Sequence, residues 1–509
     1  MTYWRALLFA TLIALGGCAQ LPPRPPLPID TAVPAAEQSA LDRRIGRAEA
    51  AHPGESGFRL VSDGSEAFVL LMQSARLAVR SLDVQTYIWR TDLTGNHLGQ
   101  VLLEAADRGV RVRLLLDDLD ARAKNDGFAA LAAHPNVEVR LFNPWATRSG
   151  IFRKLGEGAL DFERINRRMH NKSWIADNRI AIVGGRNVGD EYFAADGEMN
   201  FVDLDFAMVG PVVRDASATF DRYWNSEFAY PIESLDPDSV TDAALAGLRA
   251  AMARRAAEAR DSRQVLALRG SHLVRRMVAG YLPMQWSSNY RFVADDPAKV
   301  AMSRRDGKRT HVGATLVPML LAARERASIV SPYFVPGEEV TADLVRLAGS
   351  KTSVRVLTNS LVANDVAAVH GGYSRYREPL LRGGVQIWEL KPAGAVEASA
   401  FGSSGASLHT KAFAVDGRKL FVGSYNLDPR STWLNCEQGV LVENAVLAEE
   451  LERLFDAHTR GRHAWRVSLG DDGLAWSDGV ETLYRDPKAS LWQRFQAWAT
   501  RLLHLDAQL

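Results

Sequence analysis

The sequence contains one short phrase twice, and its residue types are those of a site that handles phosphodiesters. In each copy a histidine is followed two residues later by a lysine and, after five more, by an aspartate. The copies are His170, Lys172 and Asp177, and His409, Lys411 and Asp416. Each continues through a glycine-containing turn to an asparagine, which is Asn187 in the first copy and Asn426 in the second. One copy can supply a nucleophile and the other an acid, so together they predict a single active site.

The segments around each phrase are predicted to bring its polar groups to one ligand. His170 and Lys172 are two residues apart in an alternating segment, 169–176, so on a strand both side chains leave the same face. Asp177 follows at a predicted hairpin turn, as Asp416 does in the second copy. The chain then returns as a strand to the glycines, where the backbone can approach a ligand closely. The two aspartates are the weakest candidates for catalysis, because a turn- or strand-capping role is the favoured interpretation for them.

The repetition extends well beyond the phrase. The offsets between matching residues are 246 from Tyr87 to Tyr333, 242 from Arg113 to Arg355 and 239 from His170 to His409. A nearly constant offset over so much chain indicates two copies of one domain. Helical patterns alternate with apolar strand patterns in each copy, which predicts an α/β fold with a mostly parallel sheet flanked by helices. We expect the two domains to be related by a pseudo-twofold axis, with the two histidines on adjacent central strands and the active site at the seam.

The two phrases match the HxKx4Dx6G(G/S)xN signature, and the sequence therefore resembles the phospholipase D superfamily over roughly residues 60 to 465. Ser424 lies inside the second motif, and Glu437 stands eleven residues after Asn426. In the first half, Asp203 precedes a Gly-Pro pair by seven residues. These features resemble the branch that contains bacterial cardiolipin synthases, nearest the type C enzymes. The resemblance implies two phospholipase D-like domains that share one active site.

The resemblance also implies a two-step displacement at phosphorus. A neutral imidazole attacks the phosphodiester and forms a phosphohistidine, which divides one difficult displacement into two. A second, protonated histidine gives a proton to the leaving alkoxide. His170 is then the nucleophile and His409 the acid, although the symmetry of the motif permits the reverse.

Other side chains are expected to support these two histidines. Lysines neutralise charge on the nonbridging oxygens, and amide and hydroxyl groups add donors. A carboxylate on the second histidine nitrogen keeps the ring in the correct tautomer. The lysines are Lys172 and Lys411 and the amide donors are Asn187 and Asn426, and all four are predicted catalytic residues, together with the histidines and the motif aspartates. The predicted supporting residues are the hydroxyl donor Ser424 and the carboxylates Asp203 and Glu437. Because these side chains supply the charge, we expect no metal ion and no other cofactor.

Three functions are compatible with these residues. The first is phospholipid transphosphatidylation, most simply cardiolipin synthesis from phosphatidylglycerol with phosphatidylglycerol or phosphatidylethanolamine as donor. The second is phospholipase D-type hydrolysis of a lipid or nucleic acid, which differs only in whether water or an alcohol attacks in the second step. The third, a non-enzymatic membrane-bound lipid-binding lipoprotein, is disfavoured because every motif residue is present. The formal net charge of +1 argues against nucleic acid as a partner, and one chain holds both half-sites, so a monomeric active unit is expected.

The N-terminal segment predicts where the protein works. An apolar run, 6–15, is too short to span a bilayer and ends in small residues before Cys18, as in a secretory signal. It resembles the lipobox of bacterial lipoproteins, in which Cys18 is acylated after cleavage, and an uncleaved signal anchor is the alternative. Both place the protein at a membrane outside the cytoplasm, on the periplasmic side of the envelope. The remaining cysteine, Cys436, lies in an apolar segment and is expected in the core.

Composition divides the rest of the chain. A proline-rich stretch after Cys18 predicts an extended tether that holds the body off the bilayer. Near the C-terminus, Leu491, Phe495, Trp498 and Leu502 fall on one helical face, which fits either an interfacial helix or a helix packed on the body. The predicted divisions are a signal peptide with lipobox at 1–18, the tether at 19–57, a first phospholipase D-like domain at 58–235, a helical insertion at 236–305, a second such domain at 306–465 and an amphipathic tail at 466–509.

Overall fold

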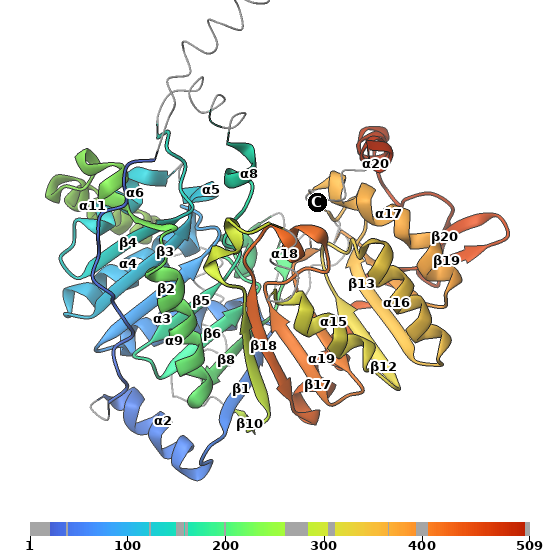
Figure 1. Ribbon diagram of the computed structural model, residues 1–509, viewed down its shortest axis with the longest axis horizontal. Coiled ribbons are helices and arrows are strands. Elements are labelled where there is room, and N and C mark those ends of the chain that lie inside the picture. The colour runs from blue at the N-terminus through green and yellow to red at the C-terminus, as the bar shows by residue number, and fades with distance from the viewer. Residues whose placement is uncertain are drawn as a thin grey trace, which may run out of the picture.

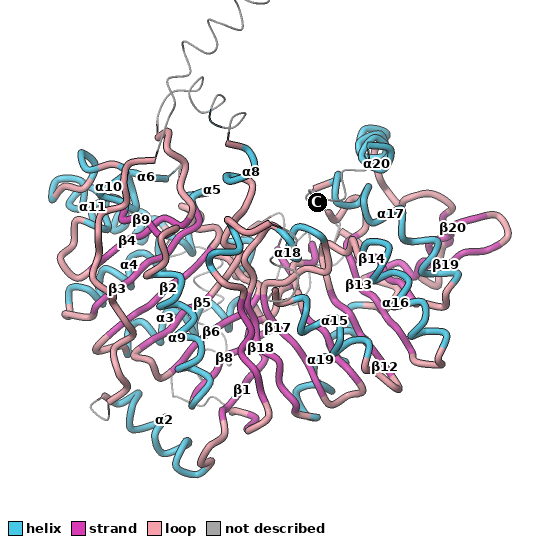
Figure 2. The backbone as a smooth tube through the Cα atoms, in the orientation of Figure 1, coloured by secondary structure: helices cyan, strands magenta, loops and turns pink. Residues whose placement is uncertain are grey.

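The computed structural model describes residues 21–36, 39–121, 124–148, 157, 161–197, 200–259, 283–303, 311–364, 366–392 and 406–503. Their strands form two large sheets and one small one, and helices pack along the large sheets (Figures 1 and 2).

The first sheet has nine strands. In spatial order they are β10 (Gln285–Ser287), β1 (Ser56–Val61), β8 (Asp205–Val209), β6 (Ile180–Gly184), β5 (Ser173–Ala176), β2 (Ser81–Thr86), β3 (Arg111–Asp117), β4 (Val137–Phe142) and β9 (Ala229–Pro231). The second sheet has ten, namely β11 (Tyr290–Ala294), β18 (Gln438–Glu443), β17 (Lys419–Gly423), β16 (Ala412–Val415), β12 (Arg326–Val330), β13 (Ser353–Asn359), β14 (Gln386–Leu390), β19 (Ala464–Gly470), β20 (Gly473–Ser477) and β21 (Thr482–Leu483).

The helices fall into the same two halves. The first half has α2 (Ala40–Ala51), α3 (Gly64–Leu77), α4 (Leu93–Asp107), α5 (Asp118–Ala121), α6 (Asn125–Ala132), α8 (Phe162–Ile165), α9 (Pro211–Trp224), α10 (Ile232–Leu235) and α11 (Asp242–Glu258). The second half has α15 (Gly313–Leu321), α16 (Gly337–Gly349), α17 (Ala367–Arg382), α18 (Pro429–Trp433), α19 (Ala445–His458) and α20 (Leu491–Leu503). Short 3-10 turns lie at Asp190–Tyr192, Pro237–Ser239 and Pro297–Val300.

The two sheets repeat one strand order, as the sequence offsets predicted. The run β1-β8-β6-β5-β2-β3-β4-β9 in the first corresponds to β11-β18-β17-β16-β12-β13-β14-β19 in the second. The α/β class and the duplication are therefore confirmed. The sheets are mixed rather than mostly parallel, because only β2-β3-β4 and β12-β13-β14 run parallel. Parallel neighbours need a long crossover, whereas β5 and β6 are joined by a tight turn that forces them antiparallel.

The second domain begins earlier than the sequence division suggested. β11 starts at Tyr290 and already pairs with β18 of the second sheet, whereas β10 still belongs to the first. At the other end of the domain, β19 to β21 extend the second sheet into the segment assigned to the tail. In the part of the tail that the structure describes, α20 then remains as the one separate helix.

One apolar cluster joins the two domains. It contains Phe58, Met169 and Phe206 from the first half and Val422 and Cys436 from the second, all fully buried. Strands β17 and β18 lie against β6 and β8 across this seam. The prediction of a buried Cys436 is confirmed. Since each domain completes the apolar core of the other, their relative position is set by packing.

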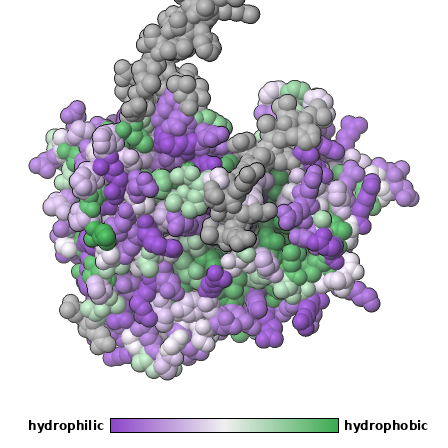
Figure 3. All heavy atoms as spheres, viewed as in Figure 1, coloured by the Kyte–Doolittle hydropathy of each residue, from purple (hydrophilic) through white to green (hydrophobic). Residues whose placement is uncertain are grey.

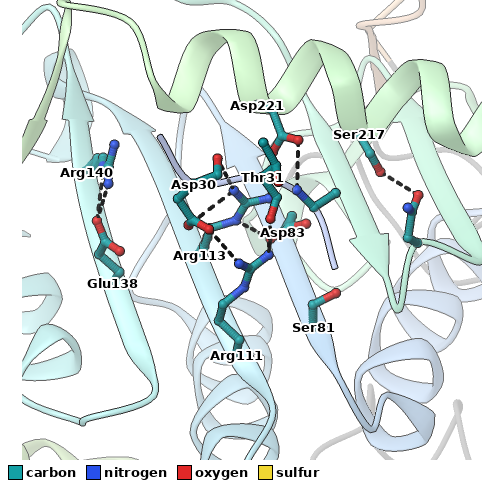
Figure 4. A network of polar contacts seen from close by, with 12 residues as sticks. Asp30, Thr31, Ser81, Asp83, Arg111, Arg113, Glu138, Arg140, Ser217 and Asp221 are labelled. Atoms are coloured by element: carbon teal, nitrogen blue, oxygen red, sulfur yellow. Dashed lines mark hydrogen bonds and ion pairs between the residues drawn. The ribbon is translucent and has the colours of Figure 1, made fainter. Parts of the chain in front are cut away.

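The proline-rich segment lies along the first domain, where the sequence suggested a free tether (Figure 4). Arg24 donates to the Ala229 carbonyl of β9 at 2.8 Å. Six residues later, Asp30 contacts Arg111 at 2.7 Å and Arg113 at 3.3 Å. A polyproline-like chain has unpaired backbone groups, and here side chains of β3, of α9 and of the residue that follows α9 satisfy several of them. The segment is thus a strap that crosses the domain before α2.

Candidate active site

Each motif histidine is held by backbone from the opposite domain. The amide of His170 donates to the Cys436 carbonyl at 2.8 Å, next to a parallel bridge between Met169 and Cys436. The amide of His409 donates to the Val202 carbonyl at 2.8 Å. There, β7 (Asn200–Val202) and β15 (Ala406–Leu408) form a small parallel sheet across the seam. The expectation of adjacent central strands is wrong, because β5 and β16, which follow the histidines, belong to different sheets.

The side chains of the histidines are also paired across the seam. Nδ1 of His170 lies 2.9 Å from Oε2 of Glu437, and Nδ1 of His409 lies 2.6 Å from Oδ2 of Asp203. Both carboxylate side chains are fully buried. A carboxylate on Nδ1 fixes the ring orientation and leaves Nε2 as the reactive nitrogen. Each half-site thus combines a histidine from one domain with a carboxylate from the other.

Two buried lysines accompany the histidines. Nζ of Lys172 donates to the His170 carbonyl at 2.7 Å, and Nζ of Lys411 donates to the His409 carbonyl at 2.5 Å. Burial, followed by the charge of Lys411, holds the pKa of Lys172 well below its usual value. An anionic ligand would relieve this repulsion between like charges, so the pair favours a phosphate-bearing substrate.

The electrostatic environment of the two histidines is unequal. Burial, followed by the charge of Lys172, lowers the pKa of His170 well below 6.5. Burial and the charge of Lys411 lower the pKa of His409 to about 4, although Asp203 opposes them. Burial favours a neutral Asp203, but the neighbouring His409 outweighs it and brings the pKa of that carboxyl to about 2. Burial instead raises the pKa of Glu437 to about 7. The His409–Asp203 pair is therefore closer to an ion pair than the His170–Glu437 pair.

The residue two positions before each motif asparagine accounts for part of the difference between the two histidine–carboxylate pairs. In the second half, Ser424 donates a short hydrogen bond to Oε2 of Glu437, the oxygen that also faces His170. In the first half the matching position is Gly185, where a Cβ atom would overlap the Asp203 carboxylate. Asp203 thus has room to approach its histidine, whereas Glu437 is shared with a hydroxyl.

The motif asparagines lie beside aromatic and hydroxyl groups. Nδ2 of Asn187 donates to the Tyr192 hydroxyl at 2.8 Å, and its Oδ1 accepts from the Ile88 amide at 3.2 Å. The backbone amide of Asn426 donates to Oγ of Ser431 at 3.3 Å. Both asparagine side chains are buried, at 2 % and 4 % exposure. They lie on the turns that follow β6 and β17, as the sequence predicted.

The motif aspartates lie at the other end of the hairpins. Asp177 comes after β5 and its carboxylate accepts the backbone amides of Val79, Arg80 and Ser81. In the second half, Asp416 accepts the amides of residues 324–326 in the same way. Both backbones have positive φ, 53° and 51°. These carboxylates tie each hairpin turn to the start of the neighbouring parallel strand.

Sequence reasoning missed the residues that pack on the histidine rings. Tyr87 meets His170 edge-on with ring centroids 5.1 Å apart, and Tyr192 meets His409 at the same separation. Phe201 lies 5.2 Å from the His409 ring. The repeat contained a signal for Tyr87, which aligns with Tyr333, but nothing in the spacing assigned it to a histidine. These rings limit solvent at the site and so strengthen its electrostatics.

One group in the described residues has metal-ligand spacing, and it lies elsewhere. His370, Glu389 and Asp486 converge beside α17. The guanidinium of Arg377 lies 2.9 Å from Glu389 and 3.0 Å from Asp486, so a cation already occupies the centre of the group. We assign this cluster to the packing of α17.

Comparisons with known proteins agree with this architecture. The family model described as "Cardiolipin synthase, PLD-like domain" matches residues 70–224 and 316–459. The chain is 39% identical over 466 residues to cardiolipin synthase C of Escherichia coli (strain K12), covering 89% of this chain and 96% of that protein. It is 24% identical over 410 residues to a cardiolipin synthase of Oceanobacillus iheyensis, covering 80% of this chain and 70% of that one. The crystal structure of phosphatidylserine synthase from Haemophilus influenzae Rd KW20 covers 92% of this chain and 100% of its own with a TM-score of 0.57 at 13% identity, which supports the fold alone.

The fold and the crossed half-sites define a duplicated α/β enzyme whose single site is assembled from two domains. The two matched domains and the 39% identical relative then show the family. The chain belongs to the cardiolipin synthase family of the phospholipase D superfamily, as its motifs predicted. Within the described residues, no helix is both long and apolar enough to cross a membrane.

Proposed function

We propose that the protein transfers a phosphatidyl group between phospholipids and makes cardiolipin. The acceptor is the glycerol hydroxyl of phosphatidylglycerol, and the donor is phosphatidylglycerol or phosphatidylethanolamine. The observation that carries the proposal is the pair of histidines with Nδ1 held by buried carboxylates, beside two buried lysines. The 39% identity to a cardiolipin synthase supports this choice of substrates.

In the first step, Nε2 of His170 attacks the donor phosphorus. An N–P bond forms, the P–O bond to the head-group alcohol breaks, and His409 gives its Nε2 proton to that alcohol. Glycerol leaves when phosphatidylglycerol is the donor, and ethanolamine leaves when phosphatidylethanolamine is. In the second step, His409 takes the proton from the acceptor hydroxyl, whose oxygen attacks phosphorus as the N–P bond breaks.

The unequal environments support this assignment of roles. A nucleophile must be neutral, and burial together with the charge of Lys172 holds the pKa of His170 well below its usual value. An acid must carry a proton, and ionised Asp203 lies 2.6 Å from His409 to stabilise the imidazolium. A bound phosphodiester adds negative charge beside both rings and raises both pKa values, which favours protonation of His409 first.

We assign the remaining motif residues to support. Lys172 and Lys411 neutralise the nonbridging oxygens as charge develops, and Asn187, Asn426 and Ser424 contribute or position donors. Asp177 and Asp416 act structurally, because their carboxylates are fully engaged by backbone amides at the far ends of the hairpins.

The test is incubation of the purified protein with labelled phosphatidylglycerol, with and without phosphatidylethanolamine, followed by separation of the lipids. We expect labelled cardiolipin, together with free glycerol or ethanolamine, and no product from His170→Ala. Accumulation of phosphatidic acid without cardiolipin would favour hydrolysis, the alternative that uses the same residues. Covalent labelling that survives in His170→Ala and is lost in His409→Ala would reverse the two roles.

We further propose that the protein is a lipoprotein on the periplasmic side of the envelope, acylated at Cys18, and that one chain is the active unit. Cys18 lies outside the described residues, so this rests on the signal-like sequence before it. Incorporation of labelled palmitate into the wild type but not into Cys18→Ser checks the acylation. A single active species at the monomer mass in light scattering checks the active unit.

A further inference from the structure

The C-terminal helix α20 lies across α17 through its small residues. Ala497 and Thr500 are buried, at 8 % and 7 % exposure. The close approach depends on Gly371 of α17, where a Cβ atom would stand 2.5 Å from the Ala497 carbonyl oxygen. Arg494 also donates to the Asp486 carbonyl at 3.0 Å. The helix is therefore held in one rotational setting about its axis.

This setting turns the aromatic face of the helix into solvent. Leu491, Trp492, Phe495 and Trp498 are 84 %, 64 %, 50 % and 56 % exposed. The rings contact one another, with centroid separations of 5.5 Å for Trp492–Phe495 and 5.9 Å for Phe495–Trp498. Figure 3 shows hydrophobic and pale side chains at the tip that α20 forms, beside mostly hydrophilic flanks. We call these four residues the aromatic face. The side chains of residues 502–509, Leu502 among them, lie outside the described part of the chain.

The aromatic face lies at the end of the molecule that contains the active site. The first residue of β5, three after His170, pairs beside the end of β2, and the matching residue of β16 pairs at the end of β12. The site is therefore at the carboxyl ends of the parallel strands. Helix α17, on which α20 rests, follows the carboxyl end of β13. In Figure 1, α5, α8 and α20 all lie at this upper end, while α2 lies at the lower one.

Two other features share this end. Leu119 of α5 and Phe162 of α8 are 48 % and 53 % exposed. The strap also starts here, because Arg24 bonds to Ala229, which pairs with the last residue of β4. The strap therefore begins at the same end as the site.

From these positions we infer that the aromatic face is a docking surface for a phospholipid bilayer, which it enters to the depth of the head groups. Tryptophan and phenylalanine are the side chains that favour this layer, and α20 contains two arginines, Arg494 and Arg501, but no acidic residue. That charge suits anionic lipid such as phosphatidylglycerol. Docking here would hold the site open towards the layer that contains its substrate. The inference deepens the proposed function, but membrane docking can be measured without turnover.

The first test uses an environment-sensitive probe on the full chain. Cys18 is replaced by serine and Phe495 by cysteine, which is then labelled with the NBD fluorophore, since Cys436 is fully buried. The matched control is Val446→Cys, which is also 50 % exposed. It lies beyond the end of β18, at the opposite end of the molecule. The Cys18→Ser parent checks that Cys436 stays unlabelled.

With vesicles of phosphatidylglycerol and phosphatidylethanolamine, we expect the NBD fluorescence at position 495 to rise severalfold and its emission to shift to the blue. Nitroxide-labelled lipid should quench this fluorescence. We expect no change at position 446. Protein that sediments with vesicles while the probe at 495 stays in water would overturn the inference. A rise at 495 that depends on protein concentration without vesicles would also overturn it, and would assign the face to contact between copies of the chain.

The second test separates docking from chemistry. In the triple variant Trp492→Ser, Phe495→Ser and Trp498→Ser, the rate of turnover of vesicle-bound phosphatidylglycerol should decrease by about tenfold or more. It should keep wild-type turnover of a short-chain, monomeric phosphatidylglycerol. Equal losses on both substrates would assign the face a structural role and reject docking. If no variant or wild type makes cardiolipin while the probe still enters vesicles, the proposed function fails and the docking surface stands.

Discussion

The role of the His409–Asp203 pair can be tested with Asp203→Asn. The variant keeps the size of the side chain but removes the charge that lies 2.6 Å from Nδ1 of His409. If the centres of the two delocalised charges are taken as about 4 Å apart, they attract each other by about 4 kcal/mol at an effective dielectric constant of about 20. That corresponds to about three pKa units. The protonated fraction of His409 should therefore fall, and turnover of a natural phospholipid at neutral pH should decrease by about 10²- to 10³-fold.

The leaving group shows whether the loss is one of acid catalysis. A phosphatidyl ester of p-nitrophenol releases a phenolate that is stable without a proton. We expect Asp203→Asn to release p-nitrophenolate in its first turnover within about tenfold of the wild-type rate, since the missing proton is not needed. The matched control is Glu437→Gln, which alters the partner of His170 and should slow both substrates alike. If Asp203→Asn slows both substrates equally, His409 is not the general acid and the assignment of roles is refuted.

Four further predictions follow from the same contacts. The pKa of His409 is about 4 in the folded chain against 6.5 in the unfolded chain, so the free energy of unfolding should be highest above pH 6.5 and decrease by about 3 kcal/mol as the pH falls from 6.5 to 4. In urea titrations, the free energy of unfolding of His409→Asn should decrease less steeply over the same pH range. Gly185→Ala should lower turnover by roughly 10- to 100-fold with little change in vesicle binding, because its methyl group displaces Asp203; wild-type turnover would contradict the described contact. Asp177→Asn should lower the free energy of unfolding by about 1–2 kcal/mol while turnover of folded protein stays within about threefold, and a selective loss of turnover would make it a direct participant. Activity should persist in excess chelator, because buried lysines supply the charge; loss that one divalent ion restores would reject this.

The sequence alone was sufficient to establish the family and the duplication, and the chemistry at the two histidines is its prediction. The spacing of His170 and His409 to their lysines and asparagines identified the family and predicted the site residues, because these motifs are short and local. The offsets between repeats predicted two α/β domains, because each strand and helix carries its own periodic pattern. The turn at the aspartate of each hairpin could also be predicted, because its conformation depends on residues that are close together along the chain.

The partners of those residues depended on contacts across the folded chain. Glu437 lies 267 residues from His170, and Asp203 lies 206 residues from His409, so no local pattern could assign either pair. The antiparallel strands that make the sheets mixed, the strap held by Asp30, and the outward setting of α20 arise in the same way. The periodicity of apolar residues indicates which face of a helix or strand is apolar, but the packing of the whole fold determines which surface contacts that face. For α20, the small residues were buried against α17 and the aromatic ones were left in solvent, the reverse of what hydrophobicity alone predicts.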